Sequence, residues 1–322
     1  MLKKSVFGLI ATAFISFLVM SLPGCGGGGG GGGAAATTPA ATPPNMASTF
    51  SEVYVANRST GVISVYARTA SGVSGLLRTI TYGQPATGNW DGVAVDKVNN
   101  EIYTMNESNQ IYVVSRTASG VVSPLRTISG ASTALATPVL LTVDTTNNEL
   151  VVANFGANSI ITFPRAASGN VAPIRTLAGA ATKLSRPEGV TINPVTNELI
   201  VGNNSAAGIT IYPRTANGNV APTRQITTAA NAVGVVVDYI NNEIIEGDQT
   251  SISVFALAAS GAVAPLRTVA TGGFAVALDN TNNEIWGSNM FANNMVVYSR
   301  TASGVPPLRT INTTGQWGIA TY

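Results

Sequence analysis

The sequence predicts an all-β fold, a six-bladed β-propeller with four antiparallel strands in each blade. Three observations indicate this fold. A template with a spacing of 41 to 49 residues recurs six times from Ser51 onward. Each copy contains four short runs rich in β-branched and aromatic residues, separated by turn residues. No part of the chain after residue 50 shows a convincing helical periodicity.

The first segment of the chain is predicted to be a targeting signal, residues 1–24. Lys3 and Lys4 precede an apolar run over residues 6–20, which is too short for a comfortable membrane-spanning helix. The Leu-Pro-Gly-Cys sequence that ends at Cys25 resembles the bacterial lipobox. This resemblance implies that Cys25 becomes the lipidated first residue of the mature chain. The alternative is an ordinary secretory signal with an incidental cysteine.

Residues 25–50 are expected to form the lipidated cysteine and a flexible tether. Eight glycines and an Ala/Thr/Pro-rich stretch follow Cys25, and such a composition cannot bury enough apolar surface to fold. A tether of about 25 residues spans roughly 25–30 Å. Because Gly26 and not aspartate follows the cysteine, the lipobox resemblance implies an exported protein, lipid-anchored at the outer membrane or cell surface. The lipid would be its contact with the membrane.

Residues 51–322 are predicted to form the propeller, and a glutamate that opens an apolar run marks each template copy. The six are Glu52, Glu101, Glu149, Glu198, Glu243 and Glu284, of which five directly follow asparagine. Asparagine tolerates left-handed backbone, so each Asn-Glu pair indicates a turn that leads into a strand.

The second copy shows the four predicted strands, over residues 92–96, 101–104, 111–114 and 125–128. The segment Arg116-Thr-Ala-Ser-Gly120 joins the third strand to the fourth, and variants of it recur in the other copies, with Leu257 in place of the arginine in the fifth. The chain enters the template at a second strand and ends with a lone first strand, residues 318–322. This last strand is therefore expected to complete the first blade and close the ring without an unpaired edge.

The pattern Gly-Val-Ala-Val-Asp, then Asn-Glu-Ile-Tyr, then Ile-x-Val-Tyr resembles the NHL-type and YVTN-type propeller repeats over about residues 51–322. One departure is in the second strand, where the aspartate common in those repeats is mostly asparagine, as in Asn106 and Asn154. Such propellers include binding modules, scaffolds and some enzymes, so the resemblance implies a fold more than a function.

Most charged residues belong to the template. Eleven arginines and ten carboxylates recur at fixed positions near strand ends on one face. We interpret them as structural ion pairs; the alternative is a charged docking face.

Without Lys3 and Lys4, 15 basic and 15 acidic residues remain. A chain with no net charge has no global field for nucleic acid or an anionic membrane surface, so neither is expected as a partner.

Five carboxylates remain outside the template: Asp91, Glu107, Glu188, Glu246 and Asp248. Four of them are expected at the opposite, loop-rich face, which usually carries the ligand in propellers. Glu246 instead occupies a predicted core position in a second strand, where a carboxylate needs a partner. Asp248, two residues on, is expected on the same side of that strand.

The residue before each first strand is predicted to reach the mouth of the central channel. Around the ring these residues are Trp317, Asp91, Val139, Glu188, Val233 and Phe274, with Trp90 adjoining. Acids beside aromatic rings suit a sugar or a cation. The predicted ligand-binding residues are therefore Trp90, Asp91, Glu188, Glu246, Asp248, Phe274 and Trp317. The alternative for each acid is a solvated or hydrogen-bonded loop residue.

Asp91-Gly92 and Glu188-Gly189 resemble the positions that bind a divalent ion in lactonase-like propellers related to senescence marker protein. The resemblance implies a metal site at Asp91 and Glu188, with Ca²⁺ the suitable ion. The sequence does not identify residues that match the other metal ligands or the general base of those lactonase-like propellers.

Absences restrict the chemistry further. The chain has no histidine, and Cys25 is its single cysteine, so disulfides, haem attachment and thiol catalysis are not expected. No cofactor is expected, with Ca²⁺ as the alternative. The leading hypothesis is a non-catalytic binding or scaffold module for a protein or glycan partner. The alternatives are a metal-dependent lactonase-like hydrolase and a structural subunit of an envelope assembly.

Overall fold

The computed structural model describes residues 52–58, 60–82, 90–205, 208–313 and 315–321. The expected signal peptide, Cys25 and the tether lie outside the described residues, and so do the side chains of Trp90, Asp91 and Trp317. The chain divides into two units, and all the described residues belong to the second, Ser48–Tyr322. Within the described residues of the second unit, no helix is long and apolar enough to cross a membrane.

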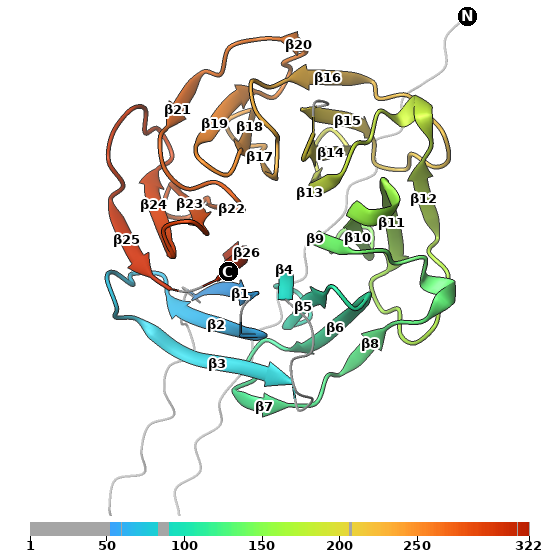
Figure 1. Cartoon of the computed structure of the whole chain (residues 1–322), viewed down its shortest axis with the longest axis horizontal. Coiled ribbons are helices and arrows are strands. Elements are labelled where there is room, and N and C mark those ends of the chain that lie inside the picture. Colours follow the sequence, from blue (N-terminus) through green and yellow to red (C-terminus); the bar gives the residue numbers. More distant parts are fainter. Residues whose placement is uncertain (1–51, 59, 83–89, 206–207, 314, 322) are drawn as a thin grey trace, which may run out of the picture. The chain divides into compact units, whose positions relative to one another are not determined.

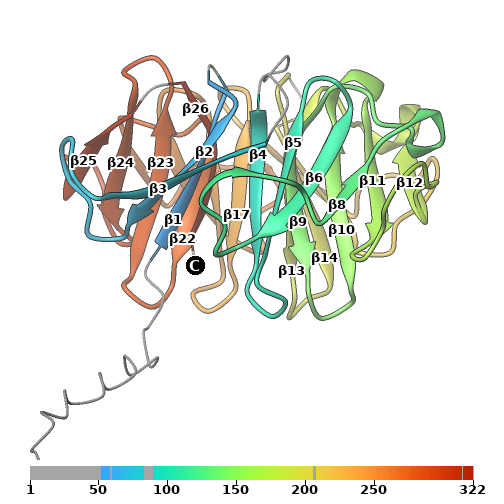
Figure 2. The ribbon, with the colours of Figure 1, turned by 90° about the horizontal axis from the view of Figure 1, so that it is seen from below.

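The described strands form six sheets that follow one another around a ring (Figure 1), which confirms the six-bladed β-propeller. Figure 2 shows the ring from its edge. Blade 1 contains β26 (Gln316–Thr321), β1 (Glu52–Asn57), β2 (Val62–Ala67) and β3 (Leu76–Tyr82); blade 2 contains β4 (Trp90–Asp96), β5 (Glu101–Asn106), β6 (Gln110–Ser115) and β8 (Arg126–Ile128); and blade 3 contains β9 (Pro138–Asp144), β10 (Glu149–Asn154), β11 (Ser159–Pro164) and β12 (Arg175–Ala178).

The second half of the ring repeats this order. Blade 4 contains β13 (Pro187–Asn193), β14 (Glu198–Asn203), β15 (Ile209–Pro213) and β16 (Arg224–Thr227); blade 5 contains β17 (Gly234–Asp238), β18 (Glu243–Gly247), β19 (Ile252–Ala256) and β21 (Arg267–Val269); and blade 6 contains β22 (Val276–Asp279), β23 (Glu284–Asn289), β24 (Asn294–Ser299) and β25 (Arg309–Asn312). Among the described loop residues, three short 3₁₀ helices occur: η1 (Ala131–Thr133), η2 (Phe155–Ala157) and η3 (Ala180–Thr182).

The ring closes as the sequence predicts. β26 pairs antiparallel with β1, so that the last strand becomes the first strand of blade 1. The predicted strand starts are too late in several blades: β4 begins at Trp90 and not at Gly92, and β13 begins at Pro187. The ladder shifts register between Pro187 and Gly189. This irregularity makes room for Glu188 at the start of an inner strand.

Neighbouring blades are also joined by backbone pairing that the sequence did not reveal. The loop between the third and fourth strands of one blade pairs in parallel with the fourth strand of the preceding blade. Two such segments are strands, β7 (Gly120–Val122) on β3 and β20 (Gly261–Ala262) on β16. In blade 3 the Gly169 N–H donates to the Thr127 carbonyl at 2.6 Å. Gly169 has φ 76°, which explains the glycine that ends the recurrent loop motif.

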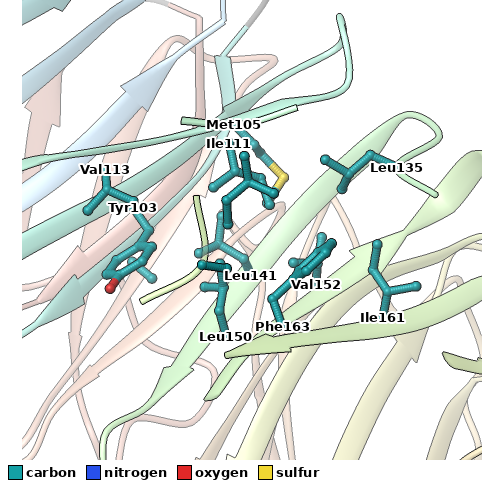
Figure 3. Packing of buried hydrophobic residues seen from close by; sticks show 13 residues of the cluster. Tyr103, Met105, Ile111, Val113, Leu135, Leu141, Leu150, Val152, Ile161 and Phe163 are labelled. Carbon is teal, nitrogen blue, oxygen red and sulfur yellow. The ribbon is translucent and has the colours of Figure 1, made fainter. Parts of the chain in front are cut away.

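The hydrophobic core lies between the blades. The described residues form six buried clusters, each contributed by two adjacent sheets. Figure 3 shows the cluster between blades 2 and 3, where Tyr103 and Met105 of β5 face Leu150 and Val152 of β10. Because strand residues alternate between two faces, Tyr54 packs toward blade 2 while Val53 and Val55 pack toward blade 6. Each sheet is thus apolar on both faces.

Candidate functional site

Charged residues of the template form a repeated ion-pair arrangement. Glu101, at the start of β5, accepts hydrogen bonds from the Arg126 guanidinium at 2.7 and 2.8 Å. Arg165 of blade 3 lies 3.3 Å from the same carboxylate and 3.3 Å from Asp96. The hydrogen bonds from Arg126 lower the pKa of Glu101, and burial raises the pKa of the adjoining Tyr103 to about 12. One arginine therefore comes from the same blade and one from the next.

The same arrangement recurs around the ring. The equivalent groups are Glu52 with Arg78 and Arg116, Glu149 with Arg175 and Arg214, Glu243 with Arg267 and Arg300, and Glu284 with Arg309 and Arg68. These contacts support the interpretation of the template charges as structural ion pairs, because each carboxylate is engaged by guanidinium groups of the chain itself.

The junction between blades 4 and 5 departs from this arrangement. Glu198 is bound by Arg224 of its own blade at 2.9 and 3.0 Å. The next blade has Leu257 where the others have the second arginine, and blade 4 has Asn193 where neighbouring blades have aspartate. The arginine and its aspartate partner are therefore replaced together at one junction.

A cavity of about 360 Å³ lies at the mouth of the central channel. It is lined by residues that precede or begin the inner strands and by residues of the loops between second and third strands, and every blade contributes. The lining residues are Arg58, Glu107, Thr137, Val139, Phe155, Arg186, Glu188, Asn204, Gln249, Phe274, Met290 and Phe291. The predicted channel-mouth positions Val139, Glu188 and Phe274 are thus brought together.

Glu188 is the most deeply buried charged residue of this cavity. Glu188 is 4% exposed, and its Oε1 accepts a hydrogen bond from the Asn204 amide at 2.9 Å. Its Oε2 is buried and has no hydrogen-bond partner among the described residues. Burial raises the pKa of Glu188, although the Asn204 hydrogen bond and the charge of Arg186 act in the opposite direction. A buried carboxylate oxygen without a donor is costly, and a ligand that supplies one would be favoured.

Two arginines and three phenylalanines complete the cavity. The Arg58 guanidinium forms an ion pair with Glu107. The Arg186 guanidinium stacks on the Phe155 ring, 4.6 Å from its centroid. Phe291 is 68% exposed at the rim. The cavity therefore offers charged groups of both signs beside apolar surface.

The backbone at the cavity is strained. Thr137 and Arg186, which precede inner strands, have φ of 47° and 52°. Each N–H is held by an asparagine of the preceding blade, Asn109 for Thr137 and Asn158 for Arg186, both at 2.7 Å. A β-branched residue such as Thr137 rarely adopts left-handed backbone, and such strain concentrates at functional sites.

The structure places Glu246 and Asp248 in a different cavity, of about 460 Å³, between blades 4 and 5. The predicted site residues therefore do not converge on one cavity: Glu188 and Phe274 lie at the channel mouth, and Glu246 and Asp248 do not. The side chains of Trp90, Asp91 and Trp317 lie outside the described part of the chain. Val233 is buried but does not line the channel-mouth cavity.

The described residues do not fit a divalent-ion site at Glu188. Among them, no group of three or more acidic, histidine or cysteine residues lies close enough to hold a metal ion. Glu107, the other carboxylate of the cavity, is paired with Arg58, and Arg186 adds a further positive charge. The side chain of the other predicted ligand, Asp91, lies outside the described part of the chain, so a Ca²⁺ site at Asp91 and Glu188 stays a prediction.

Sequence reasoning missed Arg58, Arg186, Phe155 and Asn204. The template accounts for eleven of the thirteen arginines, and the two that remain are Arg58 and Arg186. Subtraction of the template from the basic residues, and not only from the acidic ones, would have identified both. Phe155 and Asn204 carry no comparable signal, because asparagine and aromatic residues are common throughout the repeats.

Comparisons with known proteins agree on the fold. Residues 85–179 match the profile of a family described as "Lactonase, 7-bladed beta-propeller". This match covers less than a third of the chain, and the structure has six blades and not seven. No curated protein matches the sequence significantly.

Several solved structures are similar over most of the second unit. A chain of a nidogen/laminin complex is 14% identical with a TM-score of 0.63, covering 84% of this chain and 97% of its own. A functionally unknown protein from Desulfotomaculum acetoxidans DSM 771 is 14% identical with a TM-score of 0.58, covering 84% and 99%. A chain of a mitotic checkpoint complex is 18% identical with a TM-score of 0.57, covering 83% and 80%. At these identities the similarity establishes the β-propeller fold and nothing about the ligand.

Proposed function

We propose that the chain is a non-catalytic binding module that takes a glycan or a protein partner at the mouth of its central channel. The observation that carries the proposal is the buried Glu188 Oε2, which has no hydrogen-bond partner among the described residues and lines a cavity to which every blade contributes. A ligand hydroxyl or N–H group would supply the missing donor. Phe155 and Phe274 would contact the apolar face of a sugar ring or a side chain.

The wider context of the proposal comes from the sequence. We assign the repeats to the NHL/YVTN type because their sequences resemble it, and we propose that lipidation at Cys25 anchors the propeller through a tether at the outer membrane or cell surface. A rigid ring on a flexible anchor suits capture of a partner, because the tether lets the channel mouth orient freely.

Binding of the full-length protein, purified in a mild detergent, to a glycan array and to cell-envelope proteins tests the proposal. Glu188→Gln keeps the size of the side chain but removes its charge, and should weaken the identified interaction by about tenfold or more. Phe274→Ala should weaken it through loss of apolar contact. Glu246→Gln, in the other cavity, is the matched control and should bind as the wild type does. Absence of any saturable partner, or equal binding by Glu188→Gln, would contradict the proposal.

The second candidate is a lactonase-like hydrolase, which the partial family match favours. It requires a divalent ion near Asp91 and Glu188, whereas the described surroundings of Glu188 do not fit one. Calorimetry with Ca²⁺ and Mg²⁺, together with a lactone hydrolysis assay, separates the candidates. Metal binding and turnover by the wild type, both lost in Asp91→Ala and Glu188→Ala, would establish the hydrolase.

A further inference from the structure

The junction between blades 4 and 5 departs from the template at three positions. At two of these, Asn193 and Leu257 stand in place of the aspartate and the second arginine of the ion-pair arrangement, a pair that we call the arginine clamp. The third is Glu246 in β18, whose equivalents in the other blades are Val55, Thr104, Val152, Val201 and Gly287. In a repeat protein, positions that serve only the fold tend to keep the template. Several departures from the template at one junction therefore indicate that this junction has a role besides maintaining the fold.

The cavity at this junction is built from both blades. Thr227, Thr228, Ala229 and Ala230 come from the end of blade 4 and the loop that follows it. Blade 5 contributes Glu246, Asp248, Ser253, Phe255 and the loop residues Ala262, Val263, Ala264 and Pro265. The walls are mostly apolar, and carboxylates and hydroxyls form the polar part of the lining.

Glu246 is buried in this cavity without a partner. The residue is 2% exposed, and its Oε1 has no hydrogen-bond partner among the described residues. Its backbone is paired in the sheet between Val235 of β17 and Ser253 of β19. A carboxyl group kept in such surroundings needs a reason beyond packing, because valine fills the position in three other blades.

Asp248 stands beside Glu246 and is held as an anion. Its Oδ1 accepts hydrogen bonds from the backbone N–H groups of Thr250 and Ser251, at 2.9 and 2.6 Å, and its Oδ2 accepts one from the Ser251 hydroxyl at 2.8 Å. These hydrogen bonds lower the pKa of Asp248 although burial acts in the opposite direction. Burial raises the pKa of Glu246, and the charge of Asp248 raises it further. Among the lining residues, these two are the titratable groups, and none of the lining residues is basic.

We infer that this cavity is a second binding site, distinct from the channel mouth, that takes an organic cation carried on an apolar stem. The ammonium or guanidinium group would bind the unpartnered oxygen of Glu246 next to Asp248, and the stem would lie along the alanine, valine and proline walls. A bare metal ion fits less well, because Ca²⁺ takes six to eight oxygens and no group of three or more potential metal ligands occurs among the described residues.

Binding of a cation at this site should release a proton from Glu246. Glu246 is neutral at pH 7 when the cavity holds no cation, because its pKa lies at about 9. A cation favours the ionised form, so its binding releases a proton. Affinity should therefore rise about tenfold per pH unit between pH 7 and pH 9 for a cation that does not itself titrate.

Calorimetric titration of the full-length protein in non-ionic detergent with n-butylguanidinium provides the test. The inference predicts saturable binding, release of one proton at pH 7 measured in buffers of different ionisation enthalpy, and a loss of about tenfold or more in Glu246→Gln. Glu246→Val, which restores the template residue, should abolish binding while the protein keeps its circular dichroism spectrum. Glu188→Gln is the control and should leave this binding unchanged even if channel-mouth binding is lost.

Two further arms complete the experiment. A capped Ala-Arg-Ala peptide distinguishes a protein side chain from a free small cation as the source of the group: tighter binding than n-butylguanidinium indicates the former, and weaker binding the latter. Absence of binding by the wild type at millimolar concentrations, equal binding by Glu246→Gln, or preference for Ca²⁺ over n-butylguanidinium would each overturn the inference.

Discussion

The arginine clamp between blades can be tested where it is complete, at the junction of blades 2 and 3. Arg165→Leu imitates Leu257 and removes two ionic contacts of 3.3 Å, to Asp96 and Glu101, together with an exposed hydrogen bond to Asn148. The Asp96 side chain is fully buried, and those of Arg165 and Glu101 are 17% and 11% exposed. Charge-assisted hydrogen bonds at this long distance contribute about 1 kcal/mol each, so the free energy of unfolding should fall by about 2 kcal/mol.

Asp96→Asn, which imitates Asn193, should also cost about 2 kcal/mol. The amide of the variant would face the Asn99 amide, which donates to Asp96 at 2.8 Å, and the guanidinium of Arg165. In the double variant no cation remains against the new amide, so the combined loss should be about 3 kcal/mol. The coupling energy is then about 1 kcal/mol.

Urea unfolding of the wild type, the two single variants and the double variant at pH 7 and low salt measures this coupling. Additive losses within about 0.3 kcal/mol, or an unchanged Arg165→Leu variant, would refute the view that the two residues act as a unit. The reverse exchange is the matched control. Leu257→Arg combined with Asn193→Asp should stabilise the protein more than either change alone.

Two further predictions concern single residues. The folded-state pKa of Glu246, about 9, lies above its ordinary value of 4.5. The wild type therefore loses stability as the pH rises from about 4.5 to about 9. In thermal or urea unfolding as a function of pH, Glu246→Gln should be more stable than the wild type by about 3 kcal/mol at pH 7 and should show no gain below pH 4.5. A gain that does not vary with pH would contradict this reason. Gly169→Ala should destabilise the protein by about 1 kcal/mol because φ is 76°, whereas Gly169→Asn should lose less in the same urea assay; equal losses would point to a cause other than the backbone angle.

The architecture was predictable because it depends on patterns that the sequence repeats. The six glutamates count the blades, and the lone strand at residues 318–322 predicts the closure that β26 forms with β1. The parallel pairing of β7 and β20 was not predictable, since it depends on how close a loop of one blade lies to the next. The glycine of the loop motif was visible in the sequence, but its left-handed backbone became meaningful only with its hydrogen-bond partner.

The candidate site was predictable only in part, for a similar reason. The position of Glu188 before a glycine placed it at the channel mouth, where the structure has it. Its partners Asn204 and Arg186 depend on loop conformations, and the strained backbone of Arg186 is held by Asn158 of another blade. Glu246 was recognisable as an exception to the template, but its cavity exists only where two blades meet.

The pairing of β26 with β1 also governs the order in which the protein can mature. The paired residues Val53 and Thr321 are more than 250 positions apart. During synthesis β1 is made more than 250 residues before its partner β26, while the later blades receive their strands without such a delay. Contacts so distant in sequence form slowly, so the first blade should be the last to become resistant to proteolysis. A nascent or truncated chain without β26 would leave an edge of β1 unpaired and open to other molecules, so the pairing with β26 protects against association before folding is complete.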